Sequence, residues 1–332
     1  MLIIGTLIGA GFASGREIYL FFTRFGLYGQ IGMIISTIIT TLIIYEVLNK
    51  SKKYEITDYN QLLGKLNSNN KKINKLISWI VNSFLLISFY IMVAGFSAYI
   101  SQTYKAPSII SSIFFVLICF IVFNKSLKGV MKANEVLVPV LIILITYLGI
   151  KNLPYLIETK AEVYIETIKK GWLVNSILYA SYNSIILIPV LTNLKDYISD
   201  KKDISIISLA AGIIILILAF LIHGLLLKGQ FYIKELELPL IQVSLEFGNI
   251  FKYLYGIVII ISIFTSAISV GYGFLQNVTK NEKQYKIILI LMCITAILIS
   301  SVGFSKLVEM LYPIFGIFGT IQIMVVLKKN TK

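Results

Sequence analysis

Apolar runs of about 20 residues recur along the whole chain, separated by short polar connections. Each run is long enough to cross a bilayer as a helix. The runs are continuous and do not alternate with polar residues, which excludes a transmembrane β-barrel. We therefore predict an all-α polytopic membrane protein with ten spans: 2–24, 27–48, 76–102, 107–124, 129–150, 172–192, 205–227, 250–276, 286–303 and 306–327.

The spacing of the runs predicts two halves. A long polar segment, 49–75, follows the second span, and another, 228–249, follows the seventh, whereas the spans after each segment are joined tightly. Five spans place the second half in the opposite orientation, because five is odd. We predict an inverted repeat with halves at 1–150 and 151–332, which is the architecture of many secondary transporters.

Composition supports membrane insertion and explains the charge. The chain has 332 residues, of which 57% are hydrophobic and 14% charged, with a net charge of +14. With the N-terminus in the cytoplasm, cytoplasmic connections hold 19 of the 30 basic residues and the opposite connections hold ten. This distribution satisfies the positive-inside rule, so we expect both termini in the cytoplasm and no nucleic-acid partner.

Two further features narrow the class of protein. Cys119 and Cys293 lie in apolar runs with no Cys or His at ligand spacing, so neither a disulfide framework nor a metal site is expected. No basic segment precedes the first apolar run, and Arg16-Glu17 interrupts it. A cleavable signal peptide is therefore not expected.

The first span contains the most unusual stretch of the chain, Gly5-Thr-Leu-Ile-Gly-Ala-Gly-Phe-Ala-Ser-Gly-Arg-Glu17. Each of its four glycines weakens a helix by about 1 kcal/mol relative to alanine. An interrupted helix is tolerated in lipid where its backbone faces protein or a watery cavity. The stretch alone supports equally a solute-binding break and close helix packing through its small residues.

The sixth span favours the solute-binding interpretation. Its middle, Asn175-Ser-Ile-Leu-Tyr-Ala-Ser-Tyr-Asn-Ser184, is rich in polar residues, and Pro189 follows. Because interrupted spans at matching positions of two repeats indicate a transport site, we predict that spans 1 and 6 are both broken.

Such a break presents N–H groups to an anion and carbonyl groups to a cation, which suits a small zwitterionic solute. The N–H groups expected to meet a carboxylate lie around Gly11–Gly15, and the carbonyls around Ile8–Ala10. The predicted solute-binding residues are Gly9, Gly11, Ala13, Ser14, Gly15, Tyr90, Tyr179, Ser181, Tyr182 and Asn183.

The eighth span carries a stripe of hydroxyl groups. Ser262, Thr265, Ser266 and Ser269 share one helical face, an oxygen-rich environment that suits a small cation. The favoured alternative is that these hydroxyls bond back to their own helix or to a neighbouring one.

Charged residues inside the spans add three hypotheses. Glu17, just past the glycines, is a candidate for a proton site or for the group that binds a solute amine. Arg16 points to another face, and we expect it to pair with Glu309 as an outer gate. Glu135 is expected to pair with Lys132 one turn earlier. His223 receives no role.

With these residues assembled, Ile4-Gly-Thr-Leu-Ile-Gly-Ala-Gly-Phe-Ala-Ser-Gly-Arg-Glu-Ile18 resembles the first-span signature of YkvI-like bacterial membrane proteins. That family is similar to the amino acid–polyamine–organocation superfamily of LeuT-fold transporters. The resemblance implies that spans 1 and 6 bind solute. It also implies a sodium site, in sodium-coupled members, made by carbonyls of the first span with Thr265 and Ser266. The predicted ion-binding residues are Ile8, Ala10, Ser262, Thr265 and Ser266. Other members use protons.

The sequence therefore predicts a secondary transporter of the bacterial cytoplasmic membrane that moves a small amino-acid-like solute by alternating access. It is expected to need no cofactor beyond Na⁺ as a possible coupling ion. The alternative is a sensor that keeps the binding site without transporting. A membrane enzyme is disfavoured because no nucleophile–base pair has sensible spacing, and a channel because paired broken helices suit an occluded site.

Overall fold

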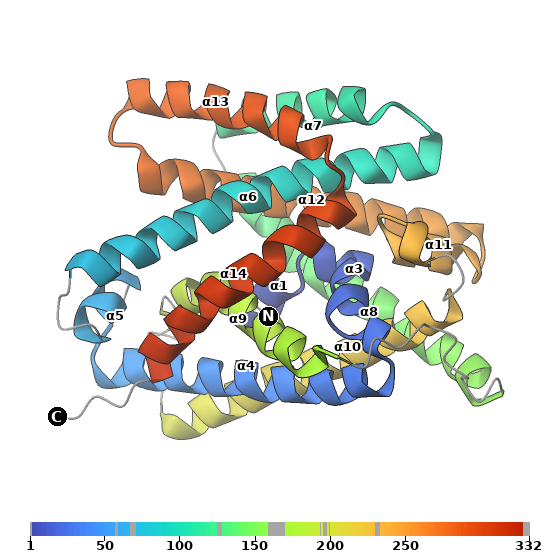
Figure 1. The fold of residues 1–332 in the computed structure, drawn as a ribbon, viewed down its shortest axis with the longest axis horizontal. Coiled ribbons are helices and arrows are strands. Elements are labelled where there is room, and N and C mark those ends of the chain that lie inside the picture. The colour runs from blue at the N-terminus through green and yellow to red at the C-terminus, as the bar shows by residue number, and fades with distance from the viewer. Residues whose placement is uncertain are drawn as a thin grey trace.

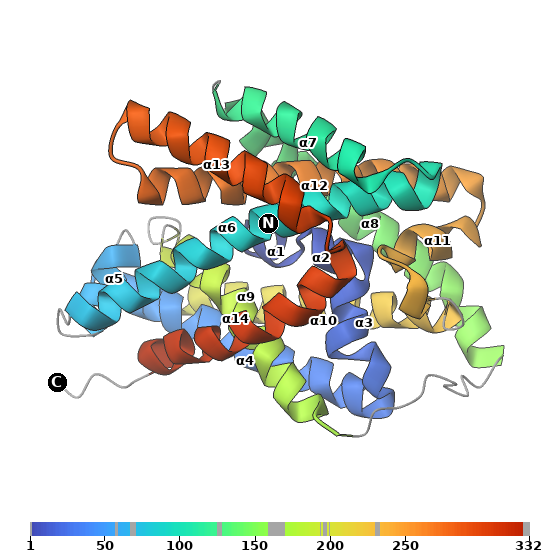
Figure 2. The ribbon, with the colours of Figure 1, turned by 45° about the horizontal axis from the view of Figure 1, so that its top comes forward.

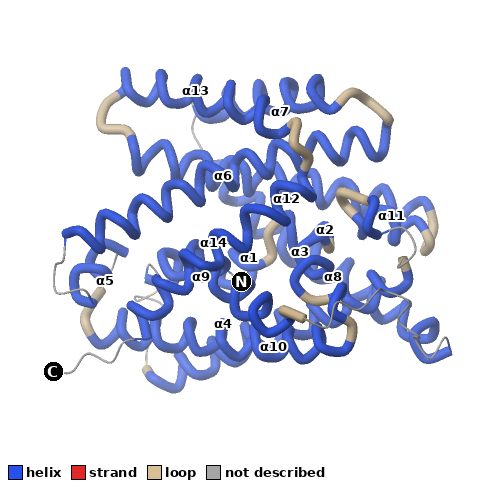
Figure 3. The backbone as a smooth tube through the Cα atoms, in the orientation of Figure 1, coloured by secondary structure: helices blue, strands red, loops and turns tan. Residues whose placement is uncertain are grey.

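Helices make up every regular element in the part of the chain that the structure describes (Figures 1 and 3). This computed structural model describes residues 2–56, 59–66, 71–124, 128–158, 170–192, 194, 198, 200–229 and 233–327. The all-α prediction is therefore confirmed for these residues.

Eight helices of the described part are long and apolar enough to cross a membrane. They are α4 (Leu27–Lys53), α6 (Lys71–Tyr104), α8 (Lys128–Glu158), α9 (Trp172–Thr192), α10 (Lys201–Lys228), α12 (Asn249–Val278), α13 (Glu282–Ser300) and α14 (Phe304–Leu327). A further apolar helix, α7 (Ser108–Phe123), has 16 residues. These nine helices coincide with predicted spans 2 to 10.

The first predicted span is interrupted, as expected. It consists of α1 (Leu2–Leu7), α2 (Ala10–Ser14), α3 (Arg16–Phe21) and a 3₁₀ turn, η1 (Thr23–Phe25). In Figure 3 these elements appear as short helices joined by loops, in contrast to the long rods around them.

The sixth predicted span is not interrupted, and this part of the prediction was wrong. The helix α9 runs without a break from Trp172 to Thr192 and contains Pro189. Its polar side chains bond back to carbonyls of the same helix: Ser176 to Trp172 (2.7 Å), Asn183 to Tyr179 (3.0 Å) and Ser184 to Ser181 (2.6 Å). The polar groups are thus satisfied without opening the backbone, and α9 contains no glycine to favour a break.

The helices pack in layers around the interrupted segment. In Figures 1 and 2, α7 and α13 form an outer layer, α6 and α12 lie next to them, and α4 and α10 lie on the opposite side. The segment α1–α3 lies between these layers with α9 and α14, and it contacts α8, α9, α10, α12 and α14. The first span therefore occupies the centre of the molecule.

Four of the five pairs of helices at equivalent positions of the two predicted halves pack together; α8 and α14 do not, within the described part of the chain. α4 contacts α10, α6 contacts α12, α7 contacts α13, and α1 contacts α9. A two-fold relation between halves would place equivalent helices beside each other. The pairing supports the inverted repeat of 1–150 and 151–332, which stays a prediction.

Exposed apolar side chains mark a surface suited to lipid. One side of α7 exposes Ile110, Phe114 and Leu117 by 61%, 58% and 56%, and α4, α10 and α13 expose similar rows. On a soluble protein such rows would be unfavourable contacts with water. In a bilayer they face hydrocarbon, so the outer layers form the lipid contact.

Two short helices lie in the two long polar segments, 49–75 and 228–249. α5 (Tyr59–Leu66) follows α4, and α11 (Pro239–Leu245) precedes α12. Leu62 of α5 is fully buried in an apolar cluster with the ends of α9 and α14.

Candidate functional site

Two glycines produce the interruption of the first span. Gly9 is extended (φ −79°, ψ −179°) and ends α1, while Gly15 is left-handed (φ 80°, ψ −7°) and separates α2 from α3. The left-handed conformation is one that glycine adopts without strain. Leu240 and Leu226 also lie against Gly15 where a Cβ would stand.

Side chains replace some of the hydrogen bonds that the break removes. Ser14 Oγ donates to the carbonyl of Gly11 (2.8 Å) and accepts from the N–H of Arg16 (3.2 Å). The hydroxyl of Tyr255, on α12, donates to the carbonyl of Ala13 (2.8 Å). These bonds hold the break in a defined shape between α12 and α3. Among many tyrosines, no sequence signal singled out Tyr255.

Glu17 lies at the centre of this arrangement. It is 4% exposed, and Tyr182 on α9 donates its hydroxyl to Glu17 Oε2. The carboxyl group of Glu17 also fills the space in which a Cβ on Gly11 would stand. The first turn of α3 thus folds its acidic side chain back along α2, and Tyr182 connects it to α9.

Aromatic rings surround this carboxylate on one side. The ring of Tyr182 lies 5.4 Å from Tyr179, 5.5 Å from Phe21 and 4.6 Å from Tyr312 between centroids. Phe22 lies 4.8 Å from Tyr179. Residues of α3, α9 and α14 therefore form one buried aromatic layer. Tyr179 and Tyr182 belong to the predicted site, and the structure brings both to the break.

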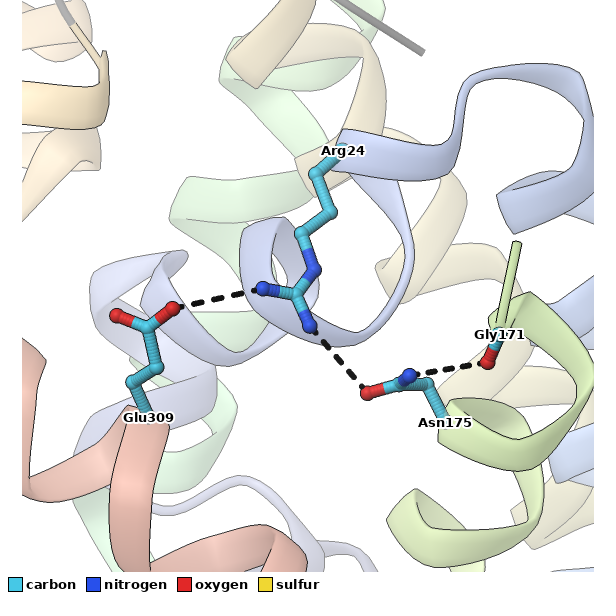
Figure 4. Close-up of polar contacts among 4 residues, drawn as sticks. All are labelled: Arg24, Gly171, Asn175 and Glu309. Atoms are coloured by element: carbon cyan, nitrogen blue, oxygen red, sulfur yellow. Dashed lines mark hydrogen bonds and ion pairs between the residues drawn. The ribbon is translucent and has the colours of Figure 1, made fainter. Parts of the chain in front are cut away.

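The expected pair of Arg16 with Glu309 was wrong, because Arg24 takes this partner. Arg24, in η1, places Nη1 3.6 Å from Glu309 Oε1 on α14 and donates Nη2 to Asn175 Oδ1 on α9 (3.4 Å) (Figure 4). Asn175 in turn donates to the carbonyl of Gly171 (2.9 Å). One guanidinium thus connects the end of the first span to α9 and α14.

Arg16 instead faces the segment between α10 and α11. Its Nη1 lies 3.4 Å from the carbonyls of Ile233 and Leu236, in and next to η3 (Ile233–Glu235). The guanidinium also lies 5.4 Å from the ring centre of Tyr19. Arg16 begins α3 beside the break, whereas Arg24 lies in η1 at the far end of the span, so the two arginines contact different elements.

His223, to which the sequence gave no role, is a buried hydrogen-bonded residue. It is 3% exposed, and its Nδ1 lies 3.0 Å from Thr23 Oγ1 and its Nε2 3.1 Å from Gln30 Nε2. It therefore joins α10 to η1 and α4. Its sequence position alone, inside an apolar run, gave no indication of these partners.

Within the hydroxyl stripe of α12, Thr265 bonds back to its own helix, which is the alternative that the sequence favoured. Thr265, which is 1% exposed, donates to its own helix at the carbonyls of Ile261 (3.0 Å) and Ser262 (3.2 Å). Ser262 is 9% exposed and Ser266 is half-buried. No described hydrogen bond joins these residues to Ile8 or Ala10, so the sodium site stays a prediction.

Three other predicted solute-binding residues bond away from the break. Tyr90 pairs with Thr295 on α13 (2.7 Å), and Ser181 accepts from Thr320 on α14 (3.1 Å). Asn183 bonds to its own helix, as described above. The side chains of Lys132 and Glu135 lie outside the described residues.

The described residues form no cluster of the side chains that usually bind a transition metal. No group of three or more His, Cys, Asp or Glu side chains gathers among them. Cys119 and Cys293 are buried free thiols.

Sequence comparison finds relatives over nearly the whole length. The chain is 27% identical over 321 residues to the uncharacterized membrane protein YkvI of Bacillus subtilis, covering 94% of this chain and 90% of the relative. It is 26% identical over 329 residues to YyaD of the same organism, covering 96% and 92%. No protein-family model matches the chain. The resemblance to YkvI-like membrane proteins is thus confirmed.

Solved structures share the fold at low sequence identity. A manganese transporter of Eremococcus coleocola, in complex with an aromatic bis-isothiourea substituted compound, superposes with a TM-score of 0.62 at 14% identity, covering 98% of this chain and 76% of that one. A Na⁺-coupled sialic acid symporter in a substrate-bound outward-open state gives 0.59 at 16% identity, covering 98% and 76%. The chain is therefore a multi-pass membrane protein with the fold of transporters, and these structural neighbours are not enzymes.

Proposed function

We propose that this protein is a secondary active transporter of the bacterial cytoplasmic membrane that carries a small amino-acid-like solute by alternating access, coupled to an ion. The observation that carries the proposal is the buried carboxylate of Glu17, beside a glycine-made interruption of the central span and bonded to Tyr182. A charged group inside a membrane span is unfavourable unless it has a function or a partner. The transporter fold of the neighbours supports the same conclusion.

The proposed topology has ten spans in two inverted halves, with both termini in the cytoplasm. In this orientation Arg24, Asn175 and Glu309 lie on the outer side. Their bonds connect η1 to α9 and α14, elements that separate when a solute enters from outside. We assign the outer gate to Arg24 and Glu309 in place of Arg16 and Glu309.

Two coupling ions are compatible with the site, and the geometry favours the proton. Glu17 is an acidic group at the break whose hydrogen-bond donor is the hydroxyl of Tyr182. A carboxyl group placed in this way can be protonated in one conformation and ionised in the other.

The substrates in the names of the structural neighbours, manganese and sialic acid, belong to those proteins. For this chain the acidic Glu17 beside tyrosine rings suits an amine. The carboxyl end of a zwitterion would be bound by another group near the break.

Binding by the purified protein tests the proposal. A thermal-shift screen of the 20 standard amino acids, in sodium and in potassium at two pH values, should identify one or a few stabilising solutes. Stabilisation that changes with pH and not with sodium supports Glu17 as the coupling group. Stabilisation only in sodium supports the site of Ile8, Ala10, Thr265 and Ser266. Binding that is indifferent to every ion favours the sensor, and no binding contradicts the proposed solute class.

A further inference from the structure

The chain uses arginine at two positions only. Of its 30 basic residues all but Arg16 and Arg24 are lysines, and both arginines lie in the part of the first span that follows the break at Gly15. Arginine differs from lysine in keeping its charge under all conditions and in binding a carboxylate through two parallel N–H groups. The restriction of arginine to this region points to a local requirement for the guanidinium group.

The two arginines are paired very differently. Arg24 has a carboxylate partner in Glu309 and an amide partner in Asn175. Arg16 has no carboxylate within 4.0 Å in the described part of the chain. Its hydrogen bonds are two 3.4 Å contacts from Nη1 to backbone carbonyls, and its buried Nε, like that of Arg24, has no acceptor.

Because Arg16 is buried, the lack of a carboxylate partner is energetically unfavourable. The residue is 6% exposed, so water solvates little of its charge. Buried charges in proteins are normally paired or fully hydrogen-bonded. Two long contacts to neutral carbonyls and an unsatisfied Nε leave the guanidinium able to gain from an anion that reaches it.

We propose that Arg16 binds the carboxylate of the transported solute, so that the site takes solutes with a free carboxylate and rejects their uncharged amides. This inference rests on the proposed function, and it names the group that holds the acidic end of the solute. The carbonyls of Ile233 and Leu236 occupy the guanidinium in the present structure. The solute carboxylate replaces them when it enters.

The positions of the nearby acidic residues are consistent with Arg16 as the group that binds the solute carboxylate. Glu17, next in the chain, turns toward α9 and Tyr182, whereas Arg16 turns toward η3. The pair therefore presents a negative and a positive group on different faces of the first turn of α3. Glu237 and Glu309 are acidic residues whose charges act on Arg16 from beyond ion-pair distance.

A binding comparison tests the proposal directly. The best-stabilising amino acid of the 20-member screen and the carboxamide of that same amino acid are titrated against the wild type, Arg16→Lys, Arg16→Gln and the control Lys228→Gln. We expect the wild type and the control to prefer the amino acid at least tenfold. The preference should fall below twofold in Arg16→Gln and be intermediate in Arg16→Lys. An undiminished preference in Arg16→Gln would overturn the role of Arg16 and leave the proposed transport function standing.

Arginine-specific labelling gives a second test with Arg16 in place. In Arg24→Lys, purified with an arginine-free tag, phenylglyoxal can modify only Arg16, and mass spectrometry follows the rate. The same amino acid should slow labelling at least fivefold, and its carboxamide should not. Equal protection by both would contradict the proposal even if Arg16→Gln failed to fold.

If no amino acid binds, simple carboxylates test the carboxylate site at Arg16 separately from the proposed transport of an amino-acid-like solute. That result contradicts the proposed amino-acid-like solute. Slower labelling of Arg16 by acetate, butyrate or benzoate, but not by acetamide, butyramide or benzamide, would still support a carboxylate site. Labelling that is unaffected by all six compounds would refute the site as well.

Discussion

The hydroxyl of Tyr182 on α9 donates to the carboxylate of Glu17 on α3, directly beside the glycine-made break of the first span. This bond connects the interrupted helix to a continuous one. If α1–α3 moves relative to α9, either this bond breaks or the side chains of Glu17 and Tyr182 move together. The pair is therefore where protonation of the carboxyl group and movement of the helices are most directly linked.

Replacing Glu17 with glutamine should remove coupling to protons. Glutamine keeps the shape of the side chain but cannot exchange a proton near neutral pH. We expect uptake driven by a proton gradient to fall at least tenfold in Glu17→Gln reconstituted in liposomes. Equal gradient-driven uptake by variant and wild type would exclude Glu17 as the coupling group.

Removing the hydroxyl of Tyr182 should weaken the same connection. A hydrogen bond to a charged group contributes about 1.5–3 kcal/mol, so Tyr182→Phe should lower transport tenfold or more. Tyr312→Phe is the matched control, because its ring packs 4.6 Å from the ring of Tyr182 in the same layer. If both variants lose activity equally, packing and not the hydroxyl bond is responsible.

Two glycines of the first span, Gly9 and Gly11, should respond differently to replacement by alanine. A Cβ at Gly11 would overlap the carboxyl group of Glu17, whereas a Cβ at Gly9 meets no atom within 4 Å. Overpacking of this kind destabilises a protein by about 1–3 kcal/mol. Gly11→Ala should therefore lower the melting temperature and transport, and Gly9→Ala should retain the wild-type melting temperature. Similar melting temperatures for the two variants would show that Glu17 does not lie against Gly11.

The pair of Arg24 and Glu309 should matter for gating more than for stability. The two side chains are 23% and 52% exposed, and exposed ion pairs contribute about 0–1 kcal/mol. We expect Arg24→Glu and Glu309→Arg each to impair uptake with little change in melting temperature. The double variant, which restores opposite charges, should recover much of the uptake. A double variant as impaired as either single one would contradict the gate.

His223 should be structural. Replacing it with leucine removes the partner of the buried hydroxyl of Thr23 and of the part-buried amide of Gln30, and a buried unsatisfied group costs about 1–3 kcal/mol. His223→Leu should therefore unfold at a lower temperature. Ser205→Ala on the same helix, whose hydroxyl bonds to the carbonyl of Lys201, should have little effect. An unchanged melting temperature in His223→Leu would argue against these bonds.

The sequence allowed the helices and the first break to be predicted, because hydrophobic run length and glycine spacing are local properties. The interruption at Gly9 and Gly15 and the buried position of Glu17 follow from such local signals. The continuity of α9 could not be predicted, since whether Asn183 and Ser184 open a helix or bond back to it depends on their surroundings.

Contacts between residues far apart in the chain also could not be predicted from the sequence. Two arginines eight positions apart were equally available to Glu309, and only the three-dimensional packing of η1 against α14 selects Arg24. The same is true of Tyr255, Thr23 and His223, whose partners are far away in the chain.

Solute flux into liposomes tests the central claim most directly. Purified protein is reconstituted, and uptake of the labelled amino acid that best stabilises it is followed under an imposed proton gradient, an imposed sodium gradient, or none. We predict saturable accumulation above the external concentration that is driven by the proton gradient and lost in Glu17→Gln. Saturable binding without accumulation under any gradient would contradict a transporter and leave a sensor.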